Sequence, residues 1–232
     1  MTDDPTTTPP PSYTKDRADA VLGEAFRRLL EYVKGARIPG DFVEFGTLRG
    51  YTARWIASLM AELEIEGDLW LYDTFEGMPE VSNSVDGESY EIATHGVWRP
   101  GSMCPDPDIE VRIETVLSSI LGPDRVHVVK GLFEETFDAH SPSGKVALAH
   151  IDCDLYASSR FVLDRLLDRD LLQDGCLLVF DDYNCNRASP RFGERRALSS
   201  ALERQDRYEV ESFFNYGWHG HAFFVHDREA TR

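Results

Sequence analysis

The sequence predicts an α/β domain built on an open, largely parallel sheet, and two strand–helix–strand units support this prediction. The first unit runs over residues 41–73 and the second over residues 145–180. In the second unit, two short apolar runs, typical of strands buried on both faces, flank a segment with helical periodicity at residues 156–170. Strands joined by a crossover helix lie parallel and side by side. A chain of 232 residues with 42% hydrophobic content is long enough for one such core and needs no second domain.

Four aspartates follow these two apolar runs, where the predicted strands end. Asp152 and Asp154 come after the first run, and Asp181 and Asp182 come after the second. Ligands of open parallel sheets bind beyond the carboxyl ends of the strands, so we expect the four side chains to lie close together. Crowded carboxylates repel unless a cation joins them, and oxygen ligands suit Mg²⁺, Mn²⁺ or Ca²⁺. The alternative role is helix capping, for which Asp154, just before the helix at Tyr156, is well placed.

The first unit carries a glycine turn between its strand and its helix. The strand at residues 41–46 leads through Gly46-x-x-x-Gly50 into a helix at residues 51–62, a spacing that differs from the dinucleotide fingerprint. Glu44 lies within this otherwise apolar strand, and a buried carboxylate needs a cation or hydrogen-bond donors. A cationic ligand, such as a sulfonium with its amino group, would meet that need. The following strand ends in Asp73, as expected of a strand that binds ribose hydroxyls.

Composition excludes several classes of protein. The net charge is −17 and no basic run is concentrated, which argues against nucleic acid as a partner. No stretch approaches eighteen apolar residues, so no membrane-spanning helix is expected. The four cysteines are scattered without a CxxC pair, which favours a reduced, cytoplasmic location. Residues 1–12 are polar and rich in Pro and Thr, so we expect a disordered tail without a signal peptide, followed by one domain over residues 13–232.

The rest of the chain predicts further helices, strands and one long loop. The expected helices cover residues 14–34, 109–121, 134–140 and 192–204. The expected strands cover residues 125–130, 208–212 and 222–225, and the last two are joined by an aromatic loop at 213–221, which makes them antiparallel. Residues 74–108 hold many glycines and prolines and no core run, so we expect a lid over the site.

Several single residues are candidates for ligand contact on weaker grounds. His95, Trp98 and Arg99 lie in the expected lid and could touch substrate. Leu132 or Phe133, after the strand that ends near Gly131, could flank an aromatic ring of a cofactor, although core packing is commoner for such residues. His219 and His221 lie two residues apart, which in a strand puts both on one face, but exposed or aromatic-packed histidines explain that spacing more simply.

Four sequence blocks together resemble the macrocin O-methyltransferase family. They are Val43-Glu44-Phe45-Gly46-Thr47, Tyr72-Asp73-Thr74-Phe75-Glu76-Gly77-Met78-Pro79, His150-Ile151-Asp152-Cys153-Asp154-Leu155-Tyr156 and Phe180-Asp181-Asp182-Tyr183. The resemblance spans about residues 12–226. It implies a class I enzyme, dependent on S-adenosylmethionine (SAM), that methylates sugar hydroxyls of bacterial secondary metabolites. It also implies a Rossmann-like, seven-stranded sheet with an antiparallel last strand, Mg²⁺ at the aspartates, and a homodimer.

The resemblance further implies roles for individual residues. Expected to bind the cofactor are Glu44, Gly46 and Asp73, with Thr47, Tyr51, Gly131 and Phe133 as further candidates. Expected to hold Mg²⁺ (or Mn²⁺) are Asp152, Asp181 and Asp182, and the base is Asp152 or Asp154. In this mechanism a divalent cation lowers the pKa of the acceptor hydroxyl, and a carboxylate takes its proton.

Three other functions remain open from the sequence. A metal-dependent catechol or phenol O-methyltransferase shares the metal chemistry and differs only in its acceptor. A hydrolase or phosphoryl-transfer enzyme could use the same aspartates, but it leaves Glu44 and Asp73 without a role. A non-catalytic binding protein on a methyltransferase fold is disfavoured because an acidic residue stands at every expected strand end.

Overall fold

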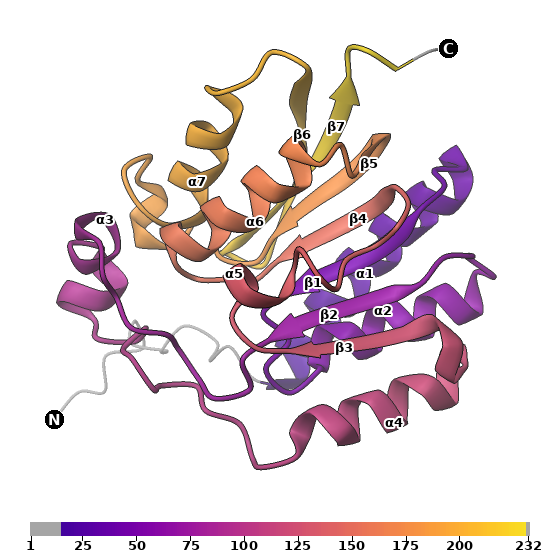
Figure 1. Ribbon diagram of the computed structural model, residues 1–232, viewed down its shortest axis with the longest axis horizontal. Helices are drawn as coiled ribbons and strands as arrows, with labels where there is room; N and C mark the ends of the chain where they lie inside the picture. Colours follow the sequence, from indigo (N-terminus) through magenta and orange to yellow (C-terminus); the bar gives the residue numbers. More distant parts are fainter. Residues whose placement is uncertain (1–14, 231–232) are drawn as a thin grey trace, which may run out of the picture.

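The protein is a three-layer α/β sandwich around one twisted sheet (Figure 1). The structure is a computed structural model, and it describes residues 15–230. The tail expected at residues 1–12 lies outside the described residues. The seven strands are ordered β3-β2-β1-β4-β5-β7-β6. No helix within residues 15–230 has both the length and the apolar character needed to cross a bilayer.

The strands and helices follow the predicted order. The strands are β1 (Asp41–Phe45), β2 (Leu69–Asp73), β3 (Val126–Lys130), β4 (Val146–Ile151), β5 (Leu172–Phe180), β6 (Tyr208–Tyr216) and β7 (Gly220–Asp227). The helices are α1 (Lys15–Ala36), α2 (Tyr51–Glu62), α3 (Ser84–Gly87), α4 (Ile109–Leu121), α5 (Phe133–Thr136), α6 (Tyr156–Asp168) and α7 (Gly193–Leu202), with a π-helical turn, η1, at Tyr90–Thr94.

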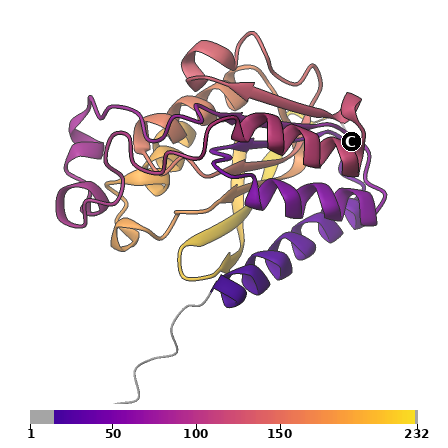
Figure 2. The same cartoon turned by 90° about the horizontal axis from the view of Figure 1, so that it is seen from below.

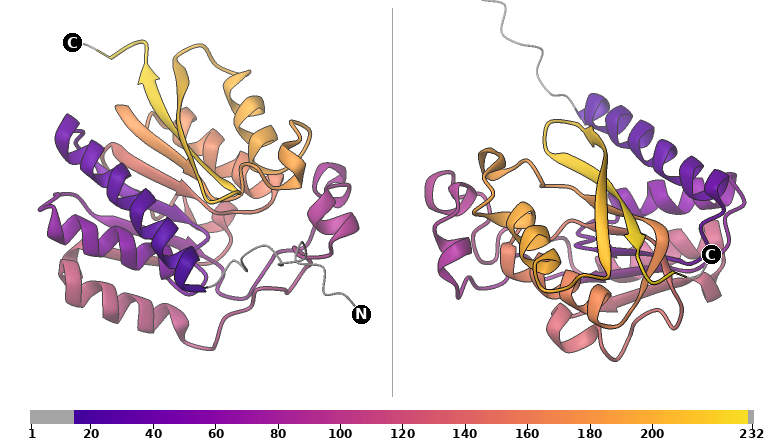
Figure 3. Two further views of the ribbon diagram at one scale, coloured as in Figure 1. Left: turned by 180° about the vertical axis from the view of Figure 1, so that it is seen from behind. Right: turned by 90° about the horizontal axis from the view of Figure 1, so that it is seen from above.

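Two apolar clusters hold the three layers together. Helices α1, α2 and α4 cover one face of the sheet, and α5, α6 and α7 cover the other, as the front and back views show (Figures 1 and 3). The central strand β4 is buried at all six positions, which is why its sequence is apolar except for His150. Because β1, β2, β4 and β5 run parallel, their carboxyl ends meet at one edge of the sheet.

The predicted fold class is confirmed, including an antiparallel last strand. Strand β7 is antiparallel to both neighbours, β5 and β6. The aromatic loop expected at residues 213–221 is wrong, however, because most of it is strand and only residues 217–219 connect β6 to β7. Aromatic packing explains the difference: the Phe213 ring lies 4.2 Å from that of Phe224 across the hairpin and 5.9 Å from that of Tyr32 on α1. Aromatic packing across the hairpin and against α1 therefore extends both strands.

The segment expected to be a lid is folded and lies beyond the carboxyl edge of the sheet (Figures 1 and 2). It contains α3, η1 and a small apolar cluster of its own. In that cluster Trp98, which is 5% exposed, packs with Leu155 and Cys185 from the turns after β4 and β5. Its contacts thus involve the same turns that carry the predicted metal ligands.

Candidate functional site

A cavity of about 710 Å³ opens at the carboxyl edge of the sheet. The end of β1, the end of β2, the two acidic turns after β4 and β5, the lid segment and the start of α5 all contribute to its wall. It brings together seven of the residues predicted from sequence: Gly46, Asp73, Phe133, Asp152, Asp154, Asp181 and Asp182. The cavity is therefore where the cofactor and metal predictions meet.

Gly46 and Asp73 shape the cofactor side of this cavity. Gly46 has φ of +91°, and a Cβ there would lie 1.8 Å from the carbonyl oxygen of Asp152, so only glycine fits. The Asp73 carboxylate accepts hydrogen bonds from the backbone N–H of Leu48 at 2.7 Å and of Phe75 at 2.6 Å. These bonds fix both the glycine turn and the carboxylate that the sequence predicted to face a ribose.

Glu44 finds its hydrogen-bond partners within the protein. It is 1% exposed and lies 3.0 Å from Nδ1 of His150, while the Thr47 hydroxyl donates to it at 3.3 Å. Burial raises the pKa of Glu44, and the hydrogen bond from His150 opposes that rise. Its burial therefore does not require a bound cation. Neither Glu44 nor Thr47 lines the cavity, so their roles with the cofactor stay predictions.

The aspartates form two overlapping groups. Carboxylate oxygens of Asp152, Asp154 and Asp182 lie within 4.8 Å of one another, and a second such group joins Asp181, Asp182 and His219. Burial first, and then repulsion from neighbouring carboxylates, raises the pKa of Asp152 and of Asp154 well above the ordinary value. The predicted trio of Asp152, Asp181 and Asp182 lines one cavity, but Asp152 and Asp181 fall in different groups that share Asp182, and Asp154 joins the group of Asp152.

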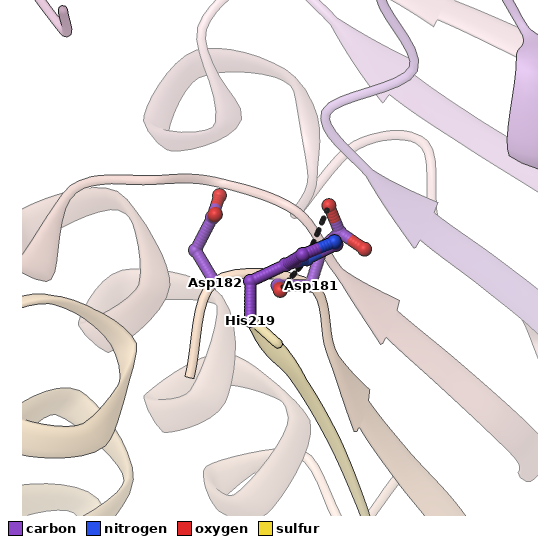
Figure 4. Close-up of side chains that lie close together, drawn as sticks. All are labelled: Asp181, Asp182 and His219. Carbon is purple, nitrogen blue, oxygen red and sulfur yellow. Dashed lines mark hydrogen bonds and ion pairs between the residues drawn. The ribbon is translucent and has the colours of Figure 1, made fainter. Parts of the chain in front are cut away.

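His219 supports Asp181 from the turn between β6 and β7. Its ring points toward Asp181, with Nδ1 2.7 Å from the backbone oxygen and 3.6 Å from the carboxylate (Figure 4). His221 behaves differently, because it lies in β7 and contacts Ser212 and Asn215. His219 precedes the strand, so the two histidines do not share a strand face, and both pack against aromatic rings, as the simpler explanation expected. The place of His219 near the aspartates could not be read from its spacing.

Two buried acids at the site were not predicted from the sequence. Glu194, in the first turn of α7, is fully buried and accepts from the backbone N–H of Cys153 at 3.4 Å and of Asp182 at 2.9 Å. Burial, and then repulsion from Asp182 and Asp181, raises the pKa of Glu194 well above its usual range. A glutamate near the start of an amphipathic helix ordinarily faces water, so the sequence carried no signal for this burial.

Asp86 is the second of these acids, and it corrects the capping prediction for Asp154. The Asp86 carboxylate, in the lid segment, accepts from the N–H groups of Tyr156 at 2.6 Å and of Ala157 at 3.1 Å. The residue at the N-cap position of α6 is Leu155, which has no capping side chain. Asp154 is therefore not the cap, and its carboxylate stays free for the acidic cluster.

Several other candidates lie away from the cavity wall. Tyr51 is 38% exposed and borders a separate pocket of about 310 Å³ beside Arg54 and Trp55. Gly131 is not among the residues that line the main cavity. Of the three lid candidates Trp98 lines the cavity, whereas His95 and Arg99 are exposed on its outside.

The residues of this cavity fit both a divalent cation and SAM. For the cation, the donor set consists of carboxylate oxygens, whose repulsion a cation would relieve. For SAM, the cavity offers space between the glycine turn at Gly46 and the aspartate cluster, and Asp73 stands at the end of the next strand. The donors and the space for both groups thus lie in one cavity.

Known proteins resemble this chain over most of its length. The family model for macrocin O-methyltransferase matches residues 18–213. A 4'-O-methyltransferase of 8-demethyl-8-(2,3-dimethoxy-alpha-L-rhamnosyl)-tetracenomycin C from Streptomyces olivaceus is 31% identical over 188 residues, covering 76% of this chain and 67% of the relative. Demethyldecarbamoylnovobiocin O-methyltransferase from Streptomyces niveus is 27% identical over 69% of this chain and 59% of its own length.

A solved structure shows the same fold. The O-methyltransferase NovP superposes with a TM-score of 0.68 at 20% identity, covering 90% of this chain and 80% of NovP. The family model, the relatives named as O-methyltransferases and this shared fold all agree with the resemblance seen in the sequence. The chain belongs to the macrocin O-methyltransferase family, and its class of activity is O-methyl transfer.

Proposed function

We propose that this protein transfers the methyl group of SAM to a sugar hydroxyl of a glycosylated natural product, or of its sugar precursor, with the help of Mg²⁺ or Mn²⁺. The observation that carries the proposal is the opening of the aspartate cluster into the same cavity as Gly46 and Asp73. The two relatives are named for methyl transfer to a rhamnosyl-tetracenomycin and to a novobiocin derivative, which supports an acceptor of that kind.

The residues at the β1 and β2 ends are proposed to hold SAM. Asp73, at the end of β2, would accept hydrogen bonds from ribose hydroxyls, as acids at that place in such sheets do. Phe133 and Leu132 line the cavity and would border the adenine ring. A cavity of about 710 Å³ leaves room for an acceptor beside the cofactor.

The aspartates are proposed to hold the metal ion and take the proton. Asp152, Asp154 and Asp182 form one group whose carboxylate oxygens are close enough to share a cation, and Asp182 also groups with Asp181 and His219. A divalent cation bound there supplies charge that lowers the pKa of the acceptor hydroxyl. Asp152 or Asp154 would accept the hydroxyl proton, since both carboxylates line the cavity where the acceptor would lie. The acceptor oxygen then forms a bond to the methyl carbon as the carbon–sulfur bond breaks.

The charges of the cavity favour a neutral or cationic acceptor. Among the described residues, its lining includes nine acids and no Lys, Arg or His. The acids are Asp73, Glu80, Asp86, Glu134, Glu135, Asp152, Asp154, Asp181 and Asp182. Even with a divalent cation and SAM in place, the wall would repel phosphate and carboxylate groups on an acceptor. A neutral glycoside would enter more readily than a sugar carried on a nucleoside diphosphate.

Titration calorimetry with SAM and S-adenosylhomocysteine (SAH), followed by Mg²⁺ with and without prior EDTA treatment, tests the proposal. We expect micromolar cofactor binding and a separate divalent site. Absence of cofactor binding would overturn the assignment. Methylation assays on neutral glycosides, nucleotide-linked sugars and catechols then identify the acceptor, and turnover confined to catechols would favour the phenol alternative.

Assembly and location are proposed from the family resemblance. A homodimer in the cytoplasm fits the family. Light scattering coupled to gel filtration would test the dimer, and a monomeric mass would reject it.

A further inference from the structure

The turns that carry the proposed metal ligands leave the sheet at β4 and β5. The last backbone hydrogen bond between these strands runs from the Asp181 N–H to the Ile151 carbonyl, at 3.0 Å. Beyond it lie Asp152 and Asp154 on one turn and Asp182 on the other. Their carboxylates repel one another, so without a further tie the turns would move apart.

Glu194 supplies that tie. One oxygen of its carboxylate accepts from the N–H of Cys153, between the two acids of the β4 turn, and the other accepts from the N–H of Asp182 on the β5 turn. The side chain is fully buried, and no ion pair found among residues 15–230 includes it. Each of its two carboxylate oxygens therefore accepts a hydrogen bond from one of the two turns.

The start of α7 places the Glu194 carboxylate beside the two turns. Gly193 has φ of +55°, and a Cβ there would lie 3.1 Å from Nδ2 of Asn186 and 3.6 Å from the carbonyl oxygen of Asp154. The positive φ favours glycine at this position, and the first turn of α7 lies beside the acidic turn, with Glu194 directly after the glycine. Behind it, Leu198 on the same helix packs into the core.

We propose that Glu194 is a positioning residue that sets the spacing of Asp152, Asp154 and Asp182, and through it the affinity for the divalent cation. This inference rests on the proposed function. Only a carboxylate at this position offers an acceptor to both turns. A glutamine of the same shape would accept from one N–H and turn its own NH₂ toward the other. The turn left without an acceptor would then shift, and one or more ligands would move away.

The test measures Mn²⁺ binding by electron paramagnetic resonance and SAH binding by calorimetry in Glu194→Gln, Glu194→Asp and the control Leu198→Ala. Residues that orient metal ligands typically change metal affinity about 10- to 100-fold. We expect a loss of that size for Mn²⁺ in Glu194→Gln, with SAH affinity within about twofold of wild type. Raising the Mg²⁺ concentration should restore turnover. The Mn²⁺ affinity of Glu194→Asp, whose shorter side chain cannot reach both turns, should lie between those of wild type and Glu194→Gln.

Leu198→Ala separates positioning from general stability. It should lower the melting temperature and leave the Mn²⁺ affinity unchanged, because it makes a cavity in the core without touching either turn. Wild-type Mn²⁺ affinity in Glu194→Gln would overturn the inference alone, as would a parallel loss of Mn²⁺ and SAH binding. Wild-type protein that binds SAH but no Mn²⁺ would overturn the metal part of the proposed function and this inference with it.

Discussion

Carboxylates gather at both edges of the central strands, but the two groups have opposite surroundings. At the carboxyl edge, Asp152, Asp154 and Asp182 crowd together, and burial and mutual repulsion raise the pKa of the first two. At the opposite edge, Asp170 and Asp227 each meet a cation. Arg207 lies 2.7 Å from both of them, and Lys145 also pairs with Asp170.

The difference separates residues kept for chemistry from residues kept for stability. At the paired edge, a hydrogen bond from Arg207 lowers the pKa of Asp227. Partial burial works to raise the pKa of Asp170, but hydrogen bonds from Lys145 and Tyr208 outweigh it and the net pKa is lowered. These pairs favour the folded state, whereas the unpaired cluster opposes it until a cation binds. Stability is given up at the edge where the ligands are needed.

The largest effect on activity is expected from removing the acid that both groups of the cluster share. Asp182 belongs to both groups of the cluster, so Asp182→Asn should lower kcat/KM by two to three orders of magnitude, on the order of 3–4 kcal/mol. SAH affinity should stay near wild type because Asp73 is untouched. The matched variant Asp227→Asn, at the paired edge, should keep its activity. Equal activity in the two variants would show that the cluster has no special role.

Asp86 tests a carboxylate that is near the site yet fully satisfied. Asp86→Ala leaves the N–H groups of Tyr156 and Ala157 without their acceptor, which should cost about 1–2 kcal/mol of stability. The lid should then exchange amide hydrogens faster over residues 82–92, and the KM for the acceptor should rise. Glu88→Ala, an exposed neighbour, serves as the control. Unchanged exchange in Asp86→Ala would mean that the lid is held by its apolar contacts alone.

Neutralising one charged side chain at each edge should shift stability in opposite directions. Asp154→Asn removes repulsion from the cluster and should raise the melting temperature of the metal-free protein. Arg207→Met breaks the ion pairs of the other edge and should cost roughly 1 kcal/mol, since the arginine is partly exposed. Scanning calorimetry in EDTA measures both. A drop in melting temperature for Asp154→Asn would contradict the repulsion argument.

The smallest effect expected is the pH dependence of stability. A carboxyl whose pKa is lowered on folding stabilises the protein above its unfolded pKa, so the contribution of Asp170 and Asp227 should fade as the pH drops below about 3.8. A carboxyl whose pKa is raised loses its contribution as the pH climbs through the folded value, so Asp152 and Asp154 should destabilise the metal-free protein toward neutral pH. Urea unfolding across pH should show both slopes, and Mg²⁺ should remove only the second.

The sequence by itself determined the fold class, the order of strands and helices and the place of the acidic cluster. The apolar runs before Asp152 and Asp181 identified buried parallel strands, and parallel strands bring their carboxyl ends to one edge whatever the details of packing. Local patterns sufficed because these features depend on the chain immediately before each residue. The length of the last hairpin did not follow, because aromatic pairing across it extends both strands.

Only the tertiary structure decided which acids hold the site in shape. Glu194 accepts a hydrogen bond from Cys153 across 41 residues, and Asp86 accepts one from Tyr156 across 70 residues, so no local pattern links these partners. The same holds for His150, whose contact with Glu44 replaced the ligand that burial alone had suggested. Hydrogen bonds between distant segments depend on how helices pack on the sheet, and a single sequence does not encode them in any readable spacing.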